Sequence, residues 1–179
     1  MCTRLPPVRC SEHMFGTILG LDPGLTTTGY GIVAIDGAHE RAVTAGAIRT
    51  DPAAPIALRL SELHRDLTAI IAEHGPQAVA IEQVFVNRNR TTAMAVARAS
   101  GVAMLAAADA GLAVAEYTPS AVKMALTGSG NAPKEQVARV VALRLRVPGI
   151  PGPADAADAL AIALCHAQHA AIAAIEAPR

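Results

Sequence analysis

The stretch that decides the fold is TILGLDPG, residues 17–24. It is a short apolar run that ends on an acid and is followed by Pro-Gly, a pattern typical of a buried strand and a turn. A second strand is predicted at Thr27–Ile35 and, after the hairpin signal Asp-Gly at 36–37, a third at Arg41–Ile48. These three strands predict an antiparallel meander at the start of a sheet.

The rest of the chain alternates between helical and strand patterns. Leucine and isoleucine at helical spacing predict a helix at 53–73, which Gly-Pro at 75–76 ends. Short apolar strands are predicted at 78–82 and 113–117, and further helices at 91–110, 119–126, 133–145 and 154–175. The order of elements predicts an α/β protein with a mixed five-stranded sheet flanked by helices.

Length and composition indicate one intracellular domain. A chain of 179 residues fits a single domain, which we place at 14–179, with 1–13 as a loose tail or an over-long start before Met14. The tail lacks an apolar signal region, and three cysteines without a CxxC pair favour reduced thiols, so we expect a cytoplasmic protein. The apolar runs read as too short for a membrane span, so no membrane association is predicted.

Four acids stand out in a chain that is only 17% charged: Asp22, Glu82, Asp155 and Asp158. Asp22 and Glu82 end predicted buried strands, and they become neighbours if those strands are adjacent and parallel. Asp155 and Asp158 lie three apart, on one face of the last predicted helix. Buried carboxylates are costly unless a cation neutralises them, and Mg²⁺ takes oxygen ligands from a few carboxylates. The pattern therefore favours metal-dependent phosphodiester chemistry.

The net charge of zero hides an uneven distribution of charge. Between residues 83 and 150 there are eight basic and three acidic residues, an excess of five positive charges. If a metal cancels the four acids, the rest of the chain is also net positive. A basic surface that faces DNA is therefore compatible with the neutral total.

Three segments together resemble the RuvC family of Holliday junction resolvases. They are ILGLDPG with TGYG (18–24 and 28–31), AIEQVF (80–85) and ADAADALAIA (154–163), in the family's order and spacing. The resemblance implies a ribonuclease H-like fold and a crossover junction endodeoxyribonuclease that resolves four-way DNA junctions by paired nicks in recombination and repair. It also implies that the four acids are catalytic and bind two Mg²⁺ or Mn²⁺ ions per active site.

The resemblance extends to residues that would contact DNA. Lys123 and Lys134 match family positions associated with binding and cleaving the junction. Phe85 is interpreted either as a wedge that stacks on bases or as an ordinary core residue. Arg88 and Arg90, in a loop that departs from the family pattern, are interpreted either as phosphate contacts or as solvated residues.

The resemblance also implies partners. Two symmetric cuts require two active sites, so we expect a homodimer, with the helix at 91–110 as the candidate contact. A complex with the RuvA–RuvB branch-migration machinery is expected as well. Two other readings stay open from the sequence: an ATP-dependent kinase or actin-like ATPase that uses DPGLT as a phosphate loop, and a catalytically silent junction-binding module. His166 and His169 imitate a metal pair, but a solvated helix end is the preferred interpretation.

Overall fold

The computed structural model describes residues 15–37, 39–83, 90–149 and 153–176. They form one five-stranded sheet of order β3-β2-β1-β4-β5, in which β1, β2 and β3 pair antiparallel and β1, β4 and β5 pair parallel. The predicted mixed sheet is therefore confirmed. The elements are β1 (Phe15–Asp22), β2 (Thr27–Asp36), β3 (His39–Arg49), α1 (Ile56–His74), β4 (Ala78–Glu82), α2 (Arg90–Asp109), β5 (Ala113–Tyr117), α3 (Pro119–Thr127), α4 (Lys134–Leu145) and α5 (Ala154–Glu176).

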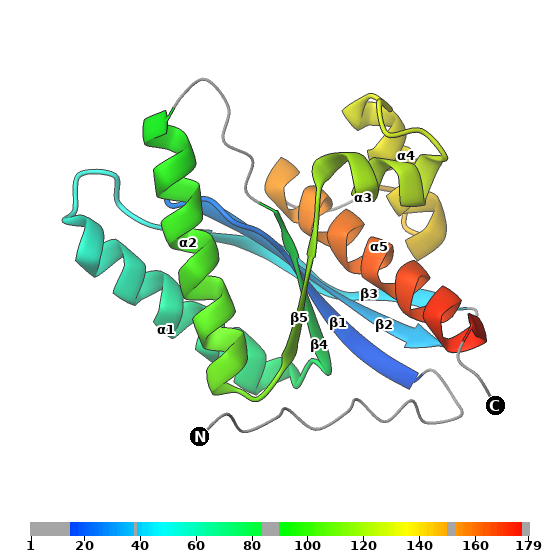
Figure 1. Ribbon diagram of the computed structural model, residues 1–179, viewed down its shortest axis with the longest axis horizontal. Coiled ribbons are helices and arrows are strands. Elements are labelled where there is room, and N and C mark those ends of the chain that lie inside the picture. Colours follow the sequence, from blue (N-terminus) through cyan, green and yellow to red (C-terminus); the bar gives the residue numbers. More distant parts are fainter. Residues whose placement is uncertain (1–14, 38, 84–89, 150–152, 177–179) are drawn as a thin grey trace.

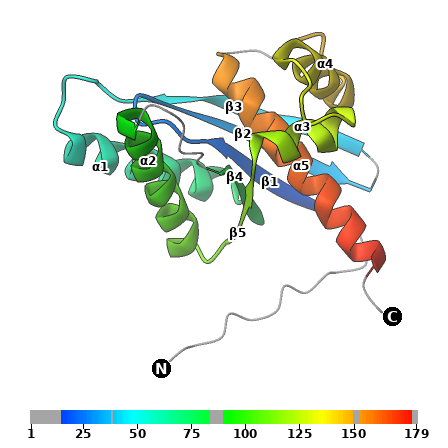
Figure 2. The same ribbon diagram turned by 45° about the horizontal axis from the view of Figure 1, so that its top comes forward.

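Helices cover both faces of the sheet. Figures 1 and 2 show α1 and α2 on one side and α5, with the α3–α4 pair above it, on the other. The apolar residues of β1 divide between these sides by the two-residue alternation of a strand: Ile18 joins the core under α5, while Leu19 and Leu21 join the core under α1 and α2. The same alternation directs Asp22, the next residue, to the α5 side.

Most predicted boundaries lie within a few residues of the observed ones, but the predicted start of the first helix is wrong. The helix begins at Ile56 and not at residue 53. The Asp51 carboxylate accepts a hydrogen bond from the backbone N–H of Ala53 at 2.9 Å, and the N–H of Ala54 donates to the Asp51 carbonyl. This local turn satisfies backbone groups outside the helix, which is the usual effect of an aspartate at a turn.

Helix α5 approaches the sheet backbone to backbone. A methyl group on Gly20 of β1 would lie 2.0 Å from the carbonyl oxygen of Ala159, and one on Gly29 of β2 would lie 2.2 Å from that of Asp155. Only residues without a Cβ allow this distance. The two glycines therefore set the height at which α5, and the acids on it, lie over the sheet.

Two described helices are long and apolar enough, by length and composition alone, to cross a membrane: Thr91–Asp109 of α2 and Ala154–Ala173 of α5. The expectation that every apolar run is too short does not hold by this measure. Helix α5 lies between the sheet and the α3–α4 pair, and half of its apolar segment is buried. The apolar composition of α5 is therefore explained by its packing on two sides, against the sheet and against the α3–α4 pair. Helix α2 packs on α1 and β5 but leaves Met94 and Leu105 exposed.

The glycine contact predicts opposite effects for the same substitution at two places. Gly20→Ala should lower the free energy of unfolding by about 1–3 kcal/mol or more, because the added methyl overpacks against the α5 backbone. Gly101→Ala, in the exposed middle of α2 with nothing within 4 Å of the new methyl, should raise it by about 0.5–1 kcal/mol through helix propensity. Urea unfolding of both variants measures this; a Gly20→Ala protein as stable as the wild type would contradict the close approach.

Candidate active site

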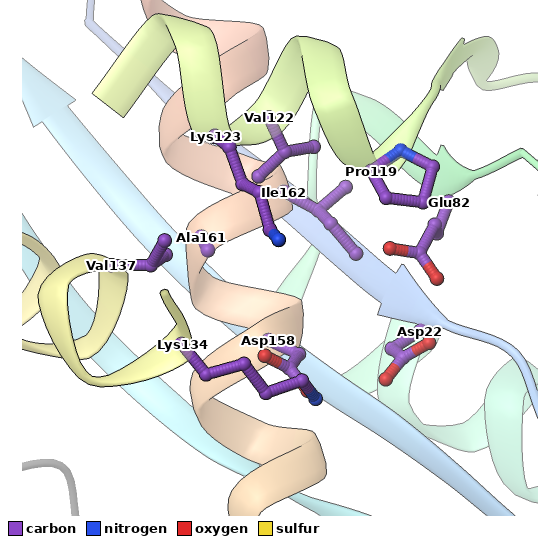
Figure 3. A pocket seen from close by; sticks show the side chains of 10 residues that line it. All are labelled: Asp22, Glu82, Pro119, Val122, Lys123, Lys134, Val137, Asp158, Ala161 and Ile162. Atoms are coloured by element: carbon purple, nitrogen blue, oxygen red, sulfur yellow. The ribbon is translucent and has the colours of Figure 1, made fainter. Parts of the chain in front are cut away.

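The first two acids meet where two parallel strands end. Asp22 is the last residue of β1 and Glu82 the last of β4, and the register Leu21↔Ile81 places them side by side at the same edge of the sheet. Strand alternation turns both side chains toward α5, and their carboxyl groups are close enough for the charge of Glu82 to raise the pKa of Asp22. Figure 3 shows the two carboxyl groups facing the same space.

Helix α5 brings the third acid to this space. Asp158 lines the pocket with Asp22 and Glu82, whereas Asp155, one turn earlier, is absent from its described lining. Asp155 is nevertheless close enough to raise the pKa of Asp22 by charge repulsion. The structure therefore brings three of the four predicted acids into one pocket and places the fourth beside it.

Both predicted lysines face the acids. Lys123 comes from the middle of α3, and Lys134 is the first residue of α4. The Lys134 ammonium donates a hydrogen bond to Asp158 Oδ2 at 2.9 Å, and this bond raises the pKa of the lysine. The pocket, whose lining side chains are drawn in Figure 3, is lined by Asp22, Glu82, Pro119, Val122, Lys123, Lys134, Val137, Asp158, Ala161 and Ile162.

The apolar lining of the pocket was missed in the sequence. Val122 and Ile162 are buried and form part of its wall. Their positions in the sequence could have predicted this lining. Ile162 lies one helical turn after Asp158, and Val122 directly precedes Lys123. These side chains exclude water next to the acids, and the exclusion strengthens electrostatic interactions in the pocket.

Crowding of negative charge strongly perturbs the acids. Burial, followed by the charges of Glu82, Asp158 and Asp155, raises the pKa of Asp22 from 3.8 to about 7. Burial and the charge of Asp158 also raise the pKa of Glu82. With pKa values raised in this way, full ionisation of the acids is unfavourable unless a cation lies nearby. The site therefore favours added positive charge.

The donor chemistry suits a hard divalent cation, although the described side chains are not arranged to hold one as they stand. Among the described residues, no group of three histidine, cysteine or acidic side chains has ligand geometry. Asp158 accepts a hydrogen bond from Lys134, and the pKa of Asp22 is raised to about 7. All available donors are carboxylate oxygens, the ligands of Mg²⁺ and Mn²⁺. A cation at Asp158 would therefore compete with Lys134 for the carboxylate.

The remaining predicted site residues are only partly described. Phe85 and Arg88 lie outside the described residues, and Arg90 begins α2 with a side chain that is not described. The solvated helix end that was predicted for the two histidines of α5 is corrected for His166, which is half-buried, whereas His169 is exposed. His166 Nδ1 and the Tyr117 hydroxyl form a hydrogen bond of 2.8 Å, and the His169 ring stacks on Tyr117. Burial lowers the pKa of His166.

The strand order is that of a ribonuclease H-like fold, and the acids at the ends of two neighbouring parallel strands and on the last helix form a candidate nuclease site. A family model for crossover junction endodeoxyribonuclease RuvC matches residues 18–166. RuvC of Halorhodospira halophila is 52% identical over 152 residues, which cover 85% of this chain and 90% of the relative. RuvC of Desulforamulus reducens is 47% identical over 151 residues, 84% of this chain and 93% of the relative.

A solved structure gives the same result. T. thermophilus RuvC in complex with a Holliday junction substrate superposes with a TM-score of 0.84 at 38% identity, covering 88% of this chain and 96% of that one. The chain belongs to the RuvC family, whose curated members are named crossover junction endodeoxyribonucleases. The kinase or actin-like ATPase reading of the DPGLT segment is therefore wrong.

The raised pKa of Asp22 predicts how the metal-free protein responds to pH. The folded protein holds this proton up to about pH 7, whereas the unfolded chain releases it near pH 3.8. Stability from this group is therefore full below pH 3.8 and is lost as the pH rises toward 7. Asp22→Asn cannot ionise, so its gain in free energy of unfolding over the wild type should grow from near zero at pH 4 to about 2–4 kcal/mol at pH 8.

Urea unfolding in the presence of a chelator measures this difference. Added Mg²⁺ serves as the control: it should stabilise the wild type at pH 8 and have little effect on the Asp22→Asn protein. An equal difference between the two proteins at pH 4 and pH 8 would contradict the electrostatic description of the site.

Proposed function

We propose that this protein is a cytoplasmic, divalent-metal-dependent endonuclease that resolves four-way (Holliday) DNA junctions by paired symmetric nicks, in recombination and DNA repair. The observation that carries the proposal is the meeting of three acids and two lysines in one pocket, in a chain that matches the RuvC family over residues 18–166. The complex of T. thermophilus RuvC with a Holliday junction, at a TM-score of 0.84, supports the choice of substrate.

In this proposal Asp22, Glu82 and Asp158, with Asp155 beside them, hold two Mg²⁺ or Mn²⁺ ions. Such ions, when bound, activate the attacking water and stabilise charge on the scissile phosphate and the leaving oxygen. The acids supply the negative charge that binds the cations, and their position on β1, β4 and α5 fixes them to the rigid part of the fold.

The lysines act on the phosphate itself. Lys123 and Lys134 line the same pocket as the acids, with Lys134 next to Asp158, and their ammonium groups stabilise charge that develops on the phosphate oxygens. Lys134 holds Asp158 in the absence of DNA and, in the presence of a cation, exchanges that contact for the phosphate. Lys134 thus pairs with Asp158 before DNA binds and contacts the phosphate afterwards.

The DNA contacts outside the pocket follow from the resemblance. Arg88 and Arg90, which adjoin the start of α2, bind backbone phosphate, and Phe85 stacks on a base at the opened centre of the junction. Glu82, three residues before Phe85 in the sequence, ends β4 at the active-site edge of the sheet.

Two symmetric cuts need two pockets, so the active form is a two-fold homodimer. Helix α2 is the proposed contact. Met94 and Leu105, eleven residues apart and so on the same helical face, are 57% and 52% exposed in the single chain. A dimer would cover this apolar face. The RuvA–RuvB branch-migration machinery is the proposed larger assembly, on the basis of the family resemblance.

Cleavage of a synthetic four-way junction tests the function. The wild type should cut it in Mg²⁺ and not in a chelator, whereas Asp22→Asn should bind the junction normally and lose cleavage, because metal-assisted activation contributes several kcal/mol. Asp66→Asn, which removes an acid from an exposed ion pair on α1, is the matched control and should cut like the wild type. An Asp22→Asn protein that cuts normally would show that the active site is elsewhere, and a wild type that binds without cutting would favour the silent binding module.

A comparison of two substrates tests Phe85. If it stacks at the junction centre, Phe85→Ala should slow cleavage of an intact junction by about 5- to 100-fold, because base–aromatic stacking is worth about 1–3 kcal/mol. A junction already unpaired at its centre should be cut almost normally. Equal loss on both substrates together with a lower melting temperature would instead identify a core phenylalanine, since such truncations cost about 3–5 kcal/mol of stability.

A further inference from the structure

One arginine joins a strand and two helices, β3, α4 and α5. Arg144, in the last turn of α4, donates from Nε to Glu40 Oε2 of β3 at 2.7 Å and from Nη2 to the other carboxylate oxygen. Its Nη1 donates to the side-chain oxygen of Gln168 of α5 at 3.2 Å. We call Glu40, Arg144 and Gln168 the clamp.

The clamp differs from the surface ion pairs of the protein. The Arg144 and Glu40 side chains are 25% and 17% exposed, whereas Arg65 in the pair with Asp66 on α1 is 71% exposed. A bidentate arginine–carboxylate contact with little exposure fixes both the distance and the orientation of the two side chains, which a single exposed contact does not.

The clamp lies at the firmly held end of α4. Leu145 next to it is buried, and the C-cap Arg146 donates its N–H to two carbonyls of the last turn. At the other end residues 133–135 are exposed, and Val137 is the first residue of α4 that is buried in the core. The clamp thus holds the C-terminal end of α4, while Lys134 stands before the first buried residue of the helix and contacts Asp158.

This arrangement makes α4 a lever. Ten residues separate Arg144 from Lys134, about 15 Å along a helix at 1.5 Å per residue. A tilt of about 4° at the clamp therefore moves the start of the helix by about 1 Å. Misplacement of a catalytic group by that amount is enough to slow a reaction by up to about a hundredfold.

We propose that the clamp is a positioning device for the active site: Glu40, Arg144 and Gln168 set the angle of α4 and thereby hold Lys134 over the acids. None of the three lies in the pocket, so their effect reaches the phosphate only through Lys134. The inference rests on the proposed function of Lys134 in cleavage.

The test removes the clamp without leaving a charge unpaired. In Glu40→Gln plus Arg144→Met, single-turnover cleavage at saturating junction should fall by roughly 10- to 100-fold, while the dissociation constant for the junction changes by less than about twofold, because Lys134 is a small part of the DNA surface. Rates are compared well below the melting temperature of each variant. Arg65→Met plus Asp66→Asn, the exposed pair on α1, is the matched control and should leave both quantities unchanged.

Non-additivity separates positioning from general damage. In a Lys134→Ala background the clamp substitutions should cause no further loss of cleavage, because the side chain through which they act is gone. A normal rate in the clamp variant, an equal further loss in the Lys134→Ala background, or normal cleavage by Lys134→Ala itself would each overturn the proposal.

A measurement without DNA keeps this inference distinct from the proposed function. In hydrogen exchange of the free protein, the clamp variant should exchange the amides at the start of α4 several-fold faster than the wild type, with α5 unchanged. If the wild type cuts no junction but this exchange rises, the proposed function fails while the clamp stands. Unchanged exchange at the start of α4 overturns the clamp, whatever the cleavage result.

Discussion

The close contact between α5 and the glycines of β1 and β2 is the constraint on which the rest of the structure depends. Without side chains at Gly20 and Gly29, the helix backbone lies directly on the sheet. That contact places Asp158 beside the acids that end β1 and β4, and it also provides the surface on which α3 and α4 pack. Core packing and the active site therefore follow from one feature, and a substitution that lifts α5 would disturb both.

The site carries an electrostatic cost that the fold must offset. Three carboxyl groups are drawn into a partly buried pocket, and burial, followed by repulsion among the acids, raises the pKa of Asp22 to about 7. In the free protein the ammonium of Lys134, bonded to Asp158, reduces that cost. A site arranged for cations is thus less stable without them, which is the usual relation between function and stability. Burial of the large apolar cores on both faces of the sheet stabilises the fold and offsets this electrostatic cost.

The sequence predicted the parts that depend on local pattern. Strand alternation and helical spacing identified the sheet and its helices, and the acids at strand ends followed from strand polarity. It did not predict contacts that depend on how helices cross the sheet. Arg144 meets Glu40 across 104 positions and Lys134 meets Asp158 across 24, and both require the angle of α4. The bond from Tyr117 to His166 and the position of Asp155 beside the pocket depend in the same way on the rotation of α5.

The two kinds of charged residue in the pocket are supported differently, and the difference suits the roles that we propose for them. The acids stand on β1, β4 and α5, which the sheet ladders and the glycine contact hold tightly. The lysines stand on α3 and α4, an outer pair that rests mainly on α5 and reaches the sheet at β3. Cation binding needs donors at fixed distances, whereas a phosphate contact must form as DNA arrives and release as it leaves. Rigid acids with lysines on a clamped but separate layer satisfy both requirements in one small domain.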